Sequence, residues 1–495
     1  MLFNSFPFIA FMALVLPMAL VLRRRVGPRN AFLLAASYYF YACWDWRFLS
    51  LIWISTAIDY YCGLRLNTTQ LTAEPMQRSR GDRWVIALSV TTNLGILGVF
   101  KYYDFFAESA AALLLTMGVE AHPATLSVIL PVGISFYTFQ TLSYTIDCYR
   151  GRVPTERNLL TFALFVAFFP QLVAGPIERA KTLLPQIQKP TVIRWEDFSS
   201  GVTLMGWGLF KKVVFADNMA PIADAAFAAQ DPSALMVVLG VYAFSIQIYC
   251  DFSGYTDIAR GVARCMGFKL MLNFNLPYFA TNPRDFWRRW HISLSTWLRD
   301  YLYIPMGGSH GSAARTYWCL MATMTLGGLW HGAGWTFVLW GLFHGGLLCA
   351  HRALEPVLAR VCPVDRGPRS LWYWIRVAVF FHLVCFGWLL FRAEDLTQVG
   401  VMLLACITEI STRLSDTVWP PPCGPRAEIS TFSAIGLLVV CAALFLVQLK
   451  QLVSGRLEFV PSLRTGTRAG LYVAAILAFL WFGATNGAAF IYFAF

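Results

Sequence analysis

Long apolar stretches, separated by short polar connections, follow one another along almost the whole chain. Each is close to the length of about 20 residues that a helix needs to cross the hydrocarbon core of a bilayer. We predict about eleven to thirteen membrane segments, some of them re-entrant or interfacial. The stretches lie near residues 6–22, 30–44, 48–62, 85–100, 126–147, 158–175, 200–216, 234–250, 315–330, 334–350, 372–391, 431–449 and 469–486.

The stretches are continuously apolar, which favours helices over a transmembrane barrel, whose strands would alternate apolar and polar residues. The chain is 57% hydrophobic and only 13% charged, whereas a soluble domain carries about 25% charged residues. We therefore predict an all-α polytopic membrane protein, with residues 1–495 forming a single membrane domain.

Basic residues dominate the connections and give the chain a net charge of +12. They lie between apolar stretches and form no single patch, so we expect contacts with membrane lipids and no nucleic-acid partner. Arg23, Arg24 and Arg25 place that connection in the cytoplasm and the N-terminus outside it. The first stretch has no basic residues before it and predicts a retained helix, not a signal peptide. The scattered cysteines indicate neither a metal site nor a disulfide framework.

Three polar segments interrupt this pattern. Residues 63–83 are basic and predict a cytoplasmic loop. Residues 176–200 are too polar to span and too aliphatic for disorder, which favours an interfacial or re-entrant element. Residues 409–430 contain the proline-rich run Trp419–Pro425 and predict a rigid loop outside the membrane.

A fourth segment, residues 282–312, combines tryptophans with arginines. Asn282 is suited to cap a helix, with Asp285 three residues later. The pattern predicts an amphipathic helix at a membrane surface or at the mouth of a cavity, with Trp287, Trp290, Leu294 and Trp297 on one face. Beside them are Arg284, Arg288, Arg289 and Arg299. These arginines suit lipid head groups, or the phosphates of a coenzyme or phosphopantetheine arm, and the pattern does not choose between them.

His331 is the first candidate for chemistry, because it stands within an uncharged apolar stretch. Ionisable groups at membrane depth usually face a cavity or a reaction centre. Burial would keep its imidazole neutral and able to accept a proton from a hydroxyl. We expect the aromatic residues near it in sequence to form an apolar wall: Trp330, Trp335, Trp340 and Phe343. The alternative is a structural histidine that joins two helices by a hydrogen bond.

His291 and His344 are two further candidates. The arginines near His291 should keep it neutral, and it would orient an acyl carbonyl or assist His331. The alternative for His291 is a surface position on an interfacial helix. His344 ends the same apolar stretch as His331 and would support that site or contact substrate.

Gln247 and Asp251 stand four residues apart and would share one face of a helix. This polar stripe would line a channel or form a packing network. The chain has no Gly-x-Ser-x-Gly elbow and no Walker-type loop. Direct acyl transfer with a histidine base is therefore simpler than a covalent intermediate, and an ATP-driven pump is not indicated.

Several motifs together resemble the membrane-bound O-acyltransferase superfamily, in particular its bacterial alginate O-acetylation branch. The similarity covers essentially the whole chain. The shared stretches are Leu130–Phe139, Phe165–Ile177, Tyr249–Ala259, Asp285–Ser295, Tyr303–Gly308, Gly328–Ala333 and Phe490–Phe495.

This resemblance implies a horseshoe-like helical fold with a central tunnel, with His331 as the catalytic base and His291 as the second catalytic position. It also implies acetyl-CoA, or another acyl thioester, as donor substrate, and no bound cofactor. In related systems a periplasmic acyltransferase completes the modification of a polysaccharide. The residues we expect to bind substrate or donor are Arg288, Arg289, Trp287, Trp330, Trp335, His344, Asp251 and Gln247.

We therefore expect an inner-membrane O-acetyltransferase that passes acetyl across the bilayer onto an exported polysaccharide, alginate or another. Transfer of D-alanine from a carrier protein, or a peptidoglycan or lipid-linked glycan acceptor, is the alternative within the same chemistry. A proton-coupled transporter is the alternative from another class, and it predicts internal repeats, which the sequence does not show. A scaffold that only recruits a periplasmic acetylase is a third possibility.

Overall fold

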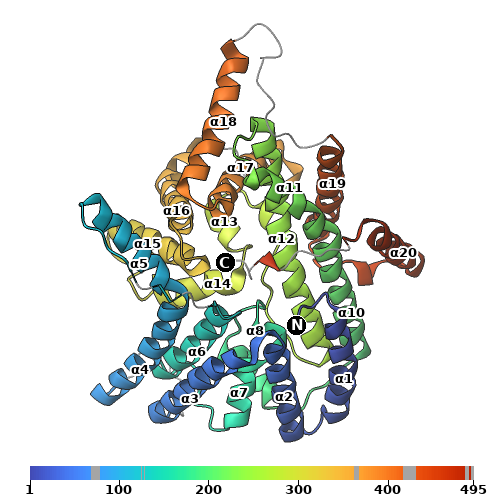
Figure 1. Ribbon diagram of the computed structural model, residues 1–495. Helices are drawn as coiled ribbons and strands as arrows, with labels where there is room; N and C mark the ends of the chain where they lie inside the picture. Colours follow the sequence, from blue (N-terminus) through green and yellow to red (C-terminus); the bar gives the residue numbers. More distant parts are fainter. Residues whose placement is uncertain are drawn as a thin grey trace. The chain divides into compact units, whose positions relative to one another are not determined.

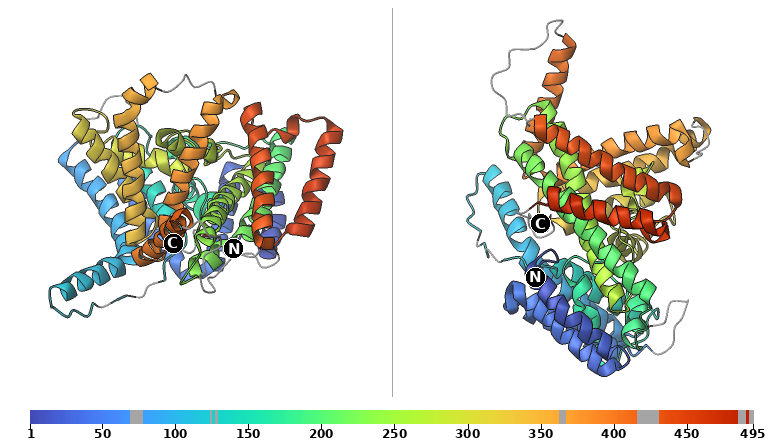
Figure 2. Two further views of the ribbon diagram at one scale, coloured as in Figure 1. Left: turned by 90° about the horizontal axis from the view of Figure 1, so that it is seen from above. Right: turned by 90° about the vertical axis from the view of Figure 1, so that its right-hand side faces the viewer.

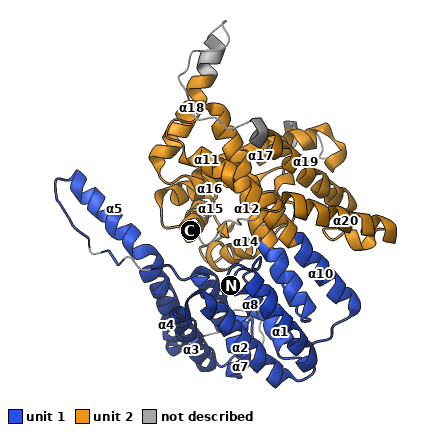
Figure 3. Cartoon of the chain, turned by 45° about the vertical axis from the view of Figure 1, so that its right-hand side comes forward, with its two compact units in different colours: residues 1–207, 255–272 blue, residues 208–254, 273–495 orange. Residues whose placement is uncertain are grey.

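The structure is a computed structural model that describes residues 1–68, 78–123, 125–126, 129–361, 367–415, 431–484 and 490–491. Helices form all of its regular structure within these ranges (Figure 1). They group into two compact units, which Figure 3 colours separately. Unit 1 comprises Met1–Trp207 and Tyr255–Leu272, and unit 2 comprises Gly208–Gly254 and Asn273–Phe495. The prediction of one domain over residues 1–495 stays a prediction.

Unit 1 contains the first helices of the chain. They are α1 (Phe6–Leu22), α2 (Val26–Asp45), α3 (Leu49–Leu66), α4 (Arg80–Leu97), α5 (Tyr103–Thr116), α6 (Ile134–Tyr149), α7 (Leu159–Ala167), α8 (Phe169–Leu172), α9 (Ala180–Ile187) and most of α10 (Trp195–Phe210). The end of α12 (Ala234–Cys265) also belongs to unit 1. Within this unit α5 extends away from the other helices (Figure 3).

A buried polar network ties three helices of unit 1 together. The carboxylate of Asp59 on α3 accepts hydrogen bonds from Asn93 on α4 and Thr145 on α6, each at 2.8 Å. Ser89 on α4 donates to the same carboxylate. Helix α4 begins at a capping box, in which Ser79 and Asp82 each accept from the other's backbone N–H. These contacts satisfy polar groups that would be costly to bury alone.

Unit 2 carries the elements that hold the candidate site. They are the π-helical turn η3 (Lys211–Ala216), α11 (Asp217–Ala228), the larger part of α12, α13 (Pro283–Trp287), α14 (Ile292–Leu298), the π-helical turn η5 (Arg299–Tyr303), α15 (Ala313–His331), α16 (Trp335–Val361), α17 (Leu371–Arg392), α18 (Leu396–Ser415), α19 (Thr431–Ser454) and α20 (Thr465–Phe482). Figure 2 shows α19 and α20, the red helices, next to each other.

Small residues let α15 and α16 approach closely. A Cβ added to Gly328 on α15 would lie 2.2 Å from the carbonyl oxygen of Phe337 on α16. A Cβ added to Gly341 on α16 would lie 2.4 Å from the carbonyl oxygen of Met324 on α15. Only glycine fits at such contacts, and small residues commonly bring membrane helices together in this way. The contact fixes the end of α15, where His331 stands.

The chain is an all-α polytopic membrane protein. Among the described residues, 5 helices are long and apolar enough to cross a membrane. They comprise Arg80–Thr116, Ala234–Cys265, Trp335–Leu358, Leu371–Arg392 and Thr465–Phe482. The larger number of eleven to thirteen stays a prediction, and so does the orientation of the N-terminus.

Two stretches differ from the expected pattern. The stretch 158–175 forms no single span, because α7 ends at Ala167 and the short α8 begins at Phe169. In the stretch 126–147 helix α6 begins at Ile134, directly after Gly133, which has a positive φ of 77°. Residues 176–200 contain α9 and the first turns of α10. The proline-rich run Trp419–Pro425 lies outside the described residues.

Candidate active site

His331 is the last residue of α15 and is only 5% exposed. Its ring centroid lies 5.0 Å from that of Trp330, 5.2 Å from Trp340 on α16 and 5.3 Å from Phe391 on α17. All three contacts are edge-to-face. The imidazole therefore lies inside an aromatic enclosure, which we define as the rings of Trp330, Trp340 and Phe391.

The glycine that follows His331 shapes this enclosure. Gly332 ends α15 with an extended backbone. A Cβ added at Gly332 would lie 2.1 Å from the ring of Phe337, which in turn packs 4.9 Å from the ring of Phe391. The missing side chain thus lets Phe337 support one wall of the enclosure.

His291 lies beside this enclosure, with its ring centroid 6.3 Å from that of His331 and 6.0 Å from that of Trp330. It is completely buried, so it does not occupy a surface position on an interfacial helix. Its backbone φ of 41° lies in the left-handed region, which is uncommon for a residue other than glycine. Such a conformation persists only where the surroundings impose it, and it is frequent at functional sites.

This left-handed residue corrects the expectation of one continuous helix in residues 282–312. Helix α13 ends at Trp287, and α14 begins at Ile292 with His291 as its N-cap residue. The predicted cap at Asn282 is present, since its side chain accepts from the N–H of Asp285 at 2.9 Å. The break turns His291 toward His331, a placement that a regular helix would not give.

Asn273 fixes the tautomer of His291. The side-chain oxygen of Asn273 accepts from the N–H of Ser293 at 3.1 Å and from its hydroxyl at 2.9 Å. The same oxygen lies 3.2 Å from Nδ1 of His291. Because that oxygen is an acceptor, Nδ1 of His291 must be the donor, and Nε2 carries the lone pair.

Burial keeps His291 neutral. Desolvation lowers the pKa of its imidazole to about 3. The expected neutrality is therefore correct, but the cause is burial and not the neighbouring arginines. A neutral imidazole whose Nε2 carries a lone pair is an acceptor of hydrogen bonds and of protons.

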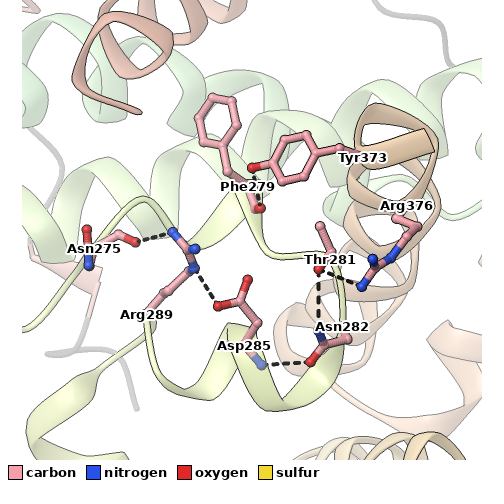
Figure 4. Close-up of polar contacts among 8 residues, drawn as sticks. All are labelled: Asn275, Phe279, Thr281, Asn282, Asp285, Arg289, Tyr373 and Arg376. Atoms are coloured by element: carbon pink, nitrogen blue, oxygen red, sulfur yellow. Dashed lines mark hydrogen bonds and ion pairs between the residues drawn. The ribbon is translucent and has the colours of Figure 1, made fainter. Parts of the chain in front are cut away.

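Polar contacts hold the loop that carries Asn273 and the start of α13 (Figure 4). Arg289 pairs with Asp285 at 2.8 Å and donates to the carbonyl of Asn275 at 3.4 Å. From α17, Tyr373 donates to the carbonyl of Phe279 at 3.1 Å, and Arg376 donates to Thr281 at 3.0 Å. Arg289 thus contacts protein groups here, whereas Arg288 is exposed.

His344 and Trp287 form a second aromatic cluster next to the enclosure. His344 on α16 is 1% exposed and its ring lies 4.7 Å from Trp340 and 5.2 Å from Trp287. Trp287 also contacts Trp340, at 5.7 Å. Trp340 therefore contacts both His331 and His344. His344 and Trp287 lie on the side of Trp340 away from the enclosed imidazole of His331.

The other expected aromatic residues lie apart from His331. Trp335 is 55% exposed at the first residue of α16. Phe343 packs against His344 at 5.4 Å and Phe386 at 5.0 Å. Of the four residues expected to form the wall, Trp330 and Trp340 do so.

Asp251 and Gln247 are both buried on α12, as their spacing predicts. The carboxylate of Asp251 pairs with Lys212 at 2.8 Å and accepts from the backbone N–H of Ile491 at 2.6 Å. Lys212 also pairs with Asp217 at 2.8 Å. Asp251 thus belongs to a buried ionic network that anchors the end of the described chain.

Lys212 is part of this network, and the sequence did not single it out. Asn273 and Phe391 were missed as well. Neither stands in a recognisable motif position, and each gains its role only through a partner distant in sequence.

Two buried imidazoles within one aromatic environment suit proton transfer from a hydroxyl group. An imidazole can act as a proton acceptor without adding a buried carboxylate charge to the site. Among the described residues, no cluster of histidine, cysteine or carboxylate side chains has the arrangement of a metal site. The imidazoles that line the site can perform acid–base chemistry.

Comparison with known proteins gives a consistent set of relatives. Residues 152–391 match the membrane-bound O-acyltransferase family. The chain is 40% identical to the probable alginate O-acetylase AlgI of Azotobacter vinelandii, over 95% of this chain and 89% of that protein. It is 45% identical to the probable alginate O-acetylase AlgI of Pseudomonas aeruginosa, over 82% and 75%. It is 38% identical to the peptidoglycan O-acetyltransferase of Helicobacter pylori, over 74% and 71%.

Proposed function

Because the chain belongs to the membrane-bound O-acyltransferase family, we propose that it transfers acetyl from cytoplasmic acetyl-CoA to hydroxyl groups of an exported polysaccharide. The chain is an acyltransferase and a multi-pass membrane protein. The proposal adds the donor, the acceptor, the inner membrane as its location and an N-terminus outside the cytoplasm. The relatives named as alginate O-acetylases support the choice of acetyl and polysaccharide.

The pairing of His331 with His291 carries the proposal. Their ring centroids are 6.3 Å apart, and both imidazoles are buried. This spacing leaves a hydroxyl group within reach of both rings. A positioned base that is kept from bulk water is what removal of a hydroxyl proton requires.

In the proposed reaction His331 accepts the proton of the acceptor hydroxyl as its oxygen attacks the thioester carbonyl carbon. A new carbon–oxygen bond forms and the carbon–sulfur bond breaks. The proton then passes from the imidazolium of His331 to the departing thiolate, which leaves as the free thiol. Atoms and charge balance without a covalent enzyme intermediate.

The tautomer of His291 narrows its role in this reaction. Its Nδ1–H is directed to Asn273, so Nε2 acts as an acceptor and does not donate to an acyl carbonyl. Of the two roles expected from the sequence, assisting His331 is therefore the better supported. The attacking hydroxyl has one proton, which His331 accepts, so Nε2 of His291 would align the acceptor by accepting from a neighbouring hydroxyl of the sugar.

The residues expected to bind the donor differ in exposure and in the protein groups that they contact. Arg288 is exposed and suits the phosphates of a coenzyme, whereas Arg289 is engaged with Asp285 and Asn275. Trp287, Trp330 and His344 adjoin the site through ring contacts, and Trp335 is more than half exposed. Acetyl-CoA enters as a substrate, and we propose no bound cofactor.

A peptidoglycan acceptor is the second candidate, and the relative of that name at 38% identity favours it. Transfer of D-alanyl from a carrier protein is a third. In either case the final acceptor could be reached through a periplasmic acyltransferase as partner. A proton-coupled transporter, or a scaffold that recruits such a partner, predicts that His331 is dispensable for thioester cleavage.

The test uses the purified full-length protein with acetyl-CoA carrying a radiolabelled acetyl group. Polysaccharide fragments and peptidoglycan fragments serve as alternative acceptors. We expect label on the polysaccharide with wild-type protein and at least about a hundredfold less label with His331→Ala. Equal labelling by His331→Ala, or flux of protons without acyl transfer, would exclude the proposal. D-alanyl carrier protein as the only accepted donor would instead support the third candidate.

A further inference from the structure

We propose that Phe391 and Trp340 restrict the acyl group to about the size of acetyl. This inference rests on the proposed function, because it concerns the acyl group that is transferred at His331. It assigns to Phe391 on α17 and Trp340 on α16 the role of specificity-determining residues. Neither the motifs nor the expected site residues assign a role to Phe391.

The positions of the two rings support this role. Both side chains are 1% exposed. Each approaches His331 with its ring roughly perpendicular to the imidazole, at 74° for Phe391 and 83° for Trp340. The two rings also contact each other, with centroids 5.5 Å apart. They therefore form a continuous wall against the imidazole of the proposed base, and the proposal places the acyl group beside this wall.

Neighbouring contacts hold this wall in place. Phe337 packs edge-to-face on Phe391 at 4.9 Å and is itself pressed against the backbone of Gly332. Trp388 on α17 contacts Phe391 at 5.6 Å and stacks on Trp340 at 6.3 Å. Close-packed interiors yield little when a group is added, so neither ring can move aside without disturbing its neighbours.

The consequence is steric selection beside the base. In this arrangement a methyl group on the acyl carbon would pack against the ring edges, whereas each further methylene would have to displace one of the rings. A pocket of this kind separates substrates that differ by one methylene by about ten- to two-hundredfold. The enclosure would therefore favour acetyl over propionyl, and propionyl over butyryl.

The test measures transfer from acetyl-, propionyl- and butyryl-CoA by the full-length protein in detergent or in vesicles. We expect wild-type protein to prefer acetyl. Phe391→Leu and Trp340→Phe should each raise the ratio of butyryl to acetyl transfer about tenfold or more, because each removes ring atoms next to His331. Two variants on different helices are used so that one that fails to fold does not decide the result.

Phe386→Leu is the matched control, because Phe386 lies on the same helix and its ring contacts Phe343. We expect its ratio to equal that of wild type. The inference would be overturned if wild type used the three donors equally. It would also be overturned if Phe391→Leu and Trp340→Phe had the same butyryl-to-acetyl ratio as Phe386→Leu. In both cases acetyl transfer by wild type would leave the proposed function intact. If wild type used none of the three donors, both proposals would fail together.

Discussion

The side-chain oxygen of Asn273 lies 3.2 Å from Nδ1 of His291 and holds that imidazole in one tautomer. Asn273 precedes α13, and His291 caps the start of α14 in a left-handed conformation. The contact therefore links the loop before α13 to the second histidine of the site. It determines which ring nitrogen of His291 is left as an acceptor.

Loss of this contact should slow acyl transfer. Asn273→Ala leaves the Nδ1–H of His291 without its acceptor and frees the ring to change tautomer. We expect kcat to fall about ten- to a hundredfold, the equivalent of one lost buried hydrogen bond, with a smaller change in KM. Kinetics of the purified variant would check this. A change in KM alone would mean that Asn273 acts on binding and not on His291.

Asn273→Asp tests the same contact through pH. A carboxylate beside Nδ1 favours the charged form of His291 and should raise its pKa from about 3. Activity of the variant should then decline as pH falls through the raised pKa, in a range where wild type shows no such loss. If the pH profiles of kcat for the two proteins were superimposable, the proton of His291 would not lie on Nδ1 beside residue 273.

His331→Ala should remove the proposed base while the fold is kept. We expect transfer to fall by about 10²–10⁴-fold, the usual contribution of a positioned base. His310→Ala is the matched control, since His310 is exposed and lies outside the enclosure. Equal turnover in both variants, each shown to be folded, would remove His331 from the mechanism.

Gly332→Ala tests the packing that supports the enclosure. The added Cβ would lie 2.1 Å from the ring of Phe337 and displace it. We expect a loss of about 1–3 kcal/mol in the free energy of unfolding, the usual cost of overpacking. Gly346→Ala is the control, because nothing lies within 4 Å of its added Cβ. Thermal unfolding in detergent measures both, and equal melting temperatures would contradict the packing argument.

The buried pairs of Lys212 should stabilise unit 2. Lys212→Met leaves the carboxylates of Asp217 and Asp251 buried without their cation, which typically costs about 3–5 kcal/mol. The double variant Lys212→Met/Asp251→Asn removes one of these charges and should recover part of the loss. Thermal unfolding of the two variants is the measurement. A double variant less stable than Lys212→Met would speak against charge as the cause.

Glu178 in unit 1 should make stability depend on pH. It is completely buried, and desolvation raises the pKa of its carboxyl to about 7. Because the pKa of Glu178 in the folded protein is above the ordinary value of 4.5, its protonated carboxyl contributes to the free energy of unfolding below pH 4.5. That contribution is lost as pH rises through 7, by at most about 3 kcal/mol.

The measurement is the melting temperature between pH 5 and pH 8. In Glu178→Gln the melting temperature should fall less between pH 5 and pH 8 than in wild type, because the amide does not titrate. Glu196→Gln, at an exposed position on α10, should behave as wild type. If the melting temperature of Glu178→Gln fell as much as that of wild type, groups other than Glu178 would cause the pH dependence.

The sequence by itself determined the helical membrane class, because a continuously apolar stretch can satisfy its backbone hydrogen bonds within a bilayer by forming a helix. It also singled out His331 and His291, since ionisable residues stand out against apolar and aromatic neighbours. The cap at Asn282 followed from local chemistry, and so did the common face of Gln247 and Asp251. Each of these depends on residues close together in the chain.

Only the tertiary structure decided how the site is assembled. The left-handed break at His291, its tautomer and its contact with His331 depend on Asn273 and on packing between helices. Phe391 became part of the enclosure because α17 packs beside α15 and α16, and no local pattern predicts that. Lys212 and Asp251 are paired for the same reason. Periodicity and composition describe one segment at a time, whereas these contacts join segments far apart in the chain.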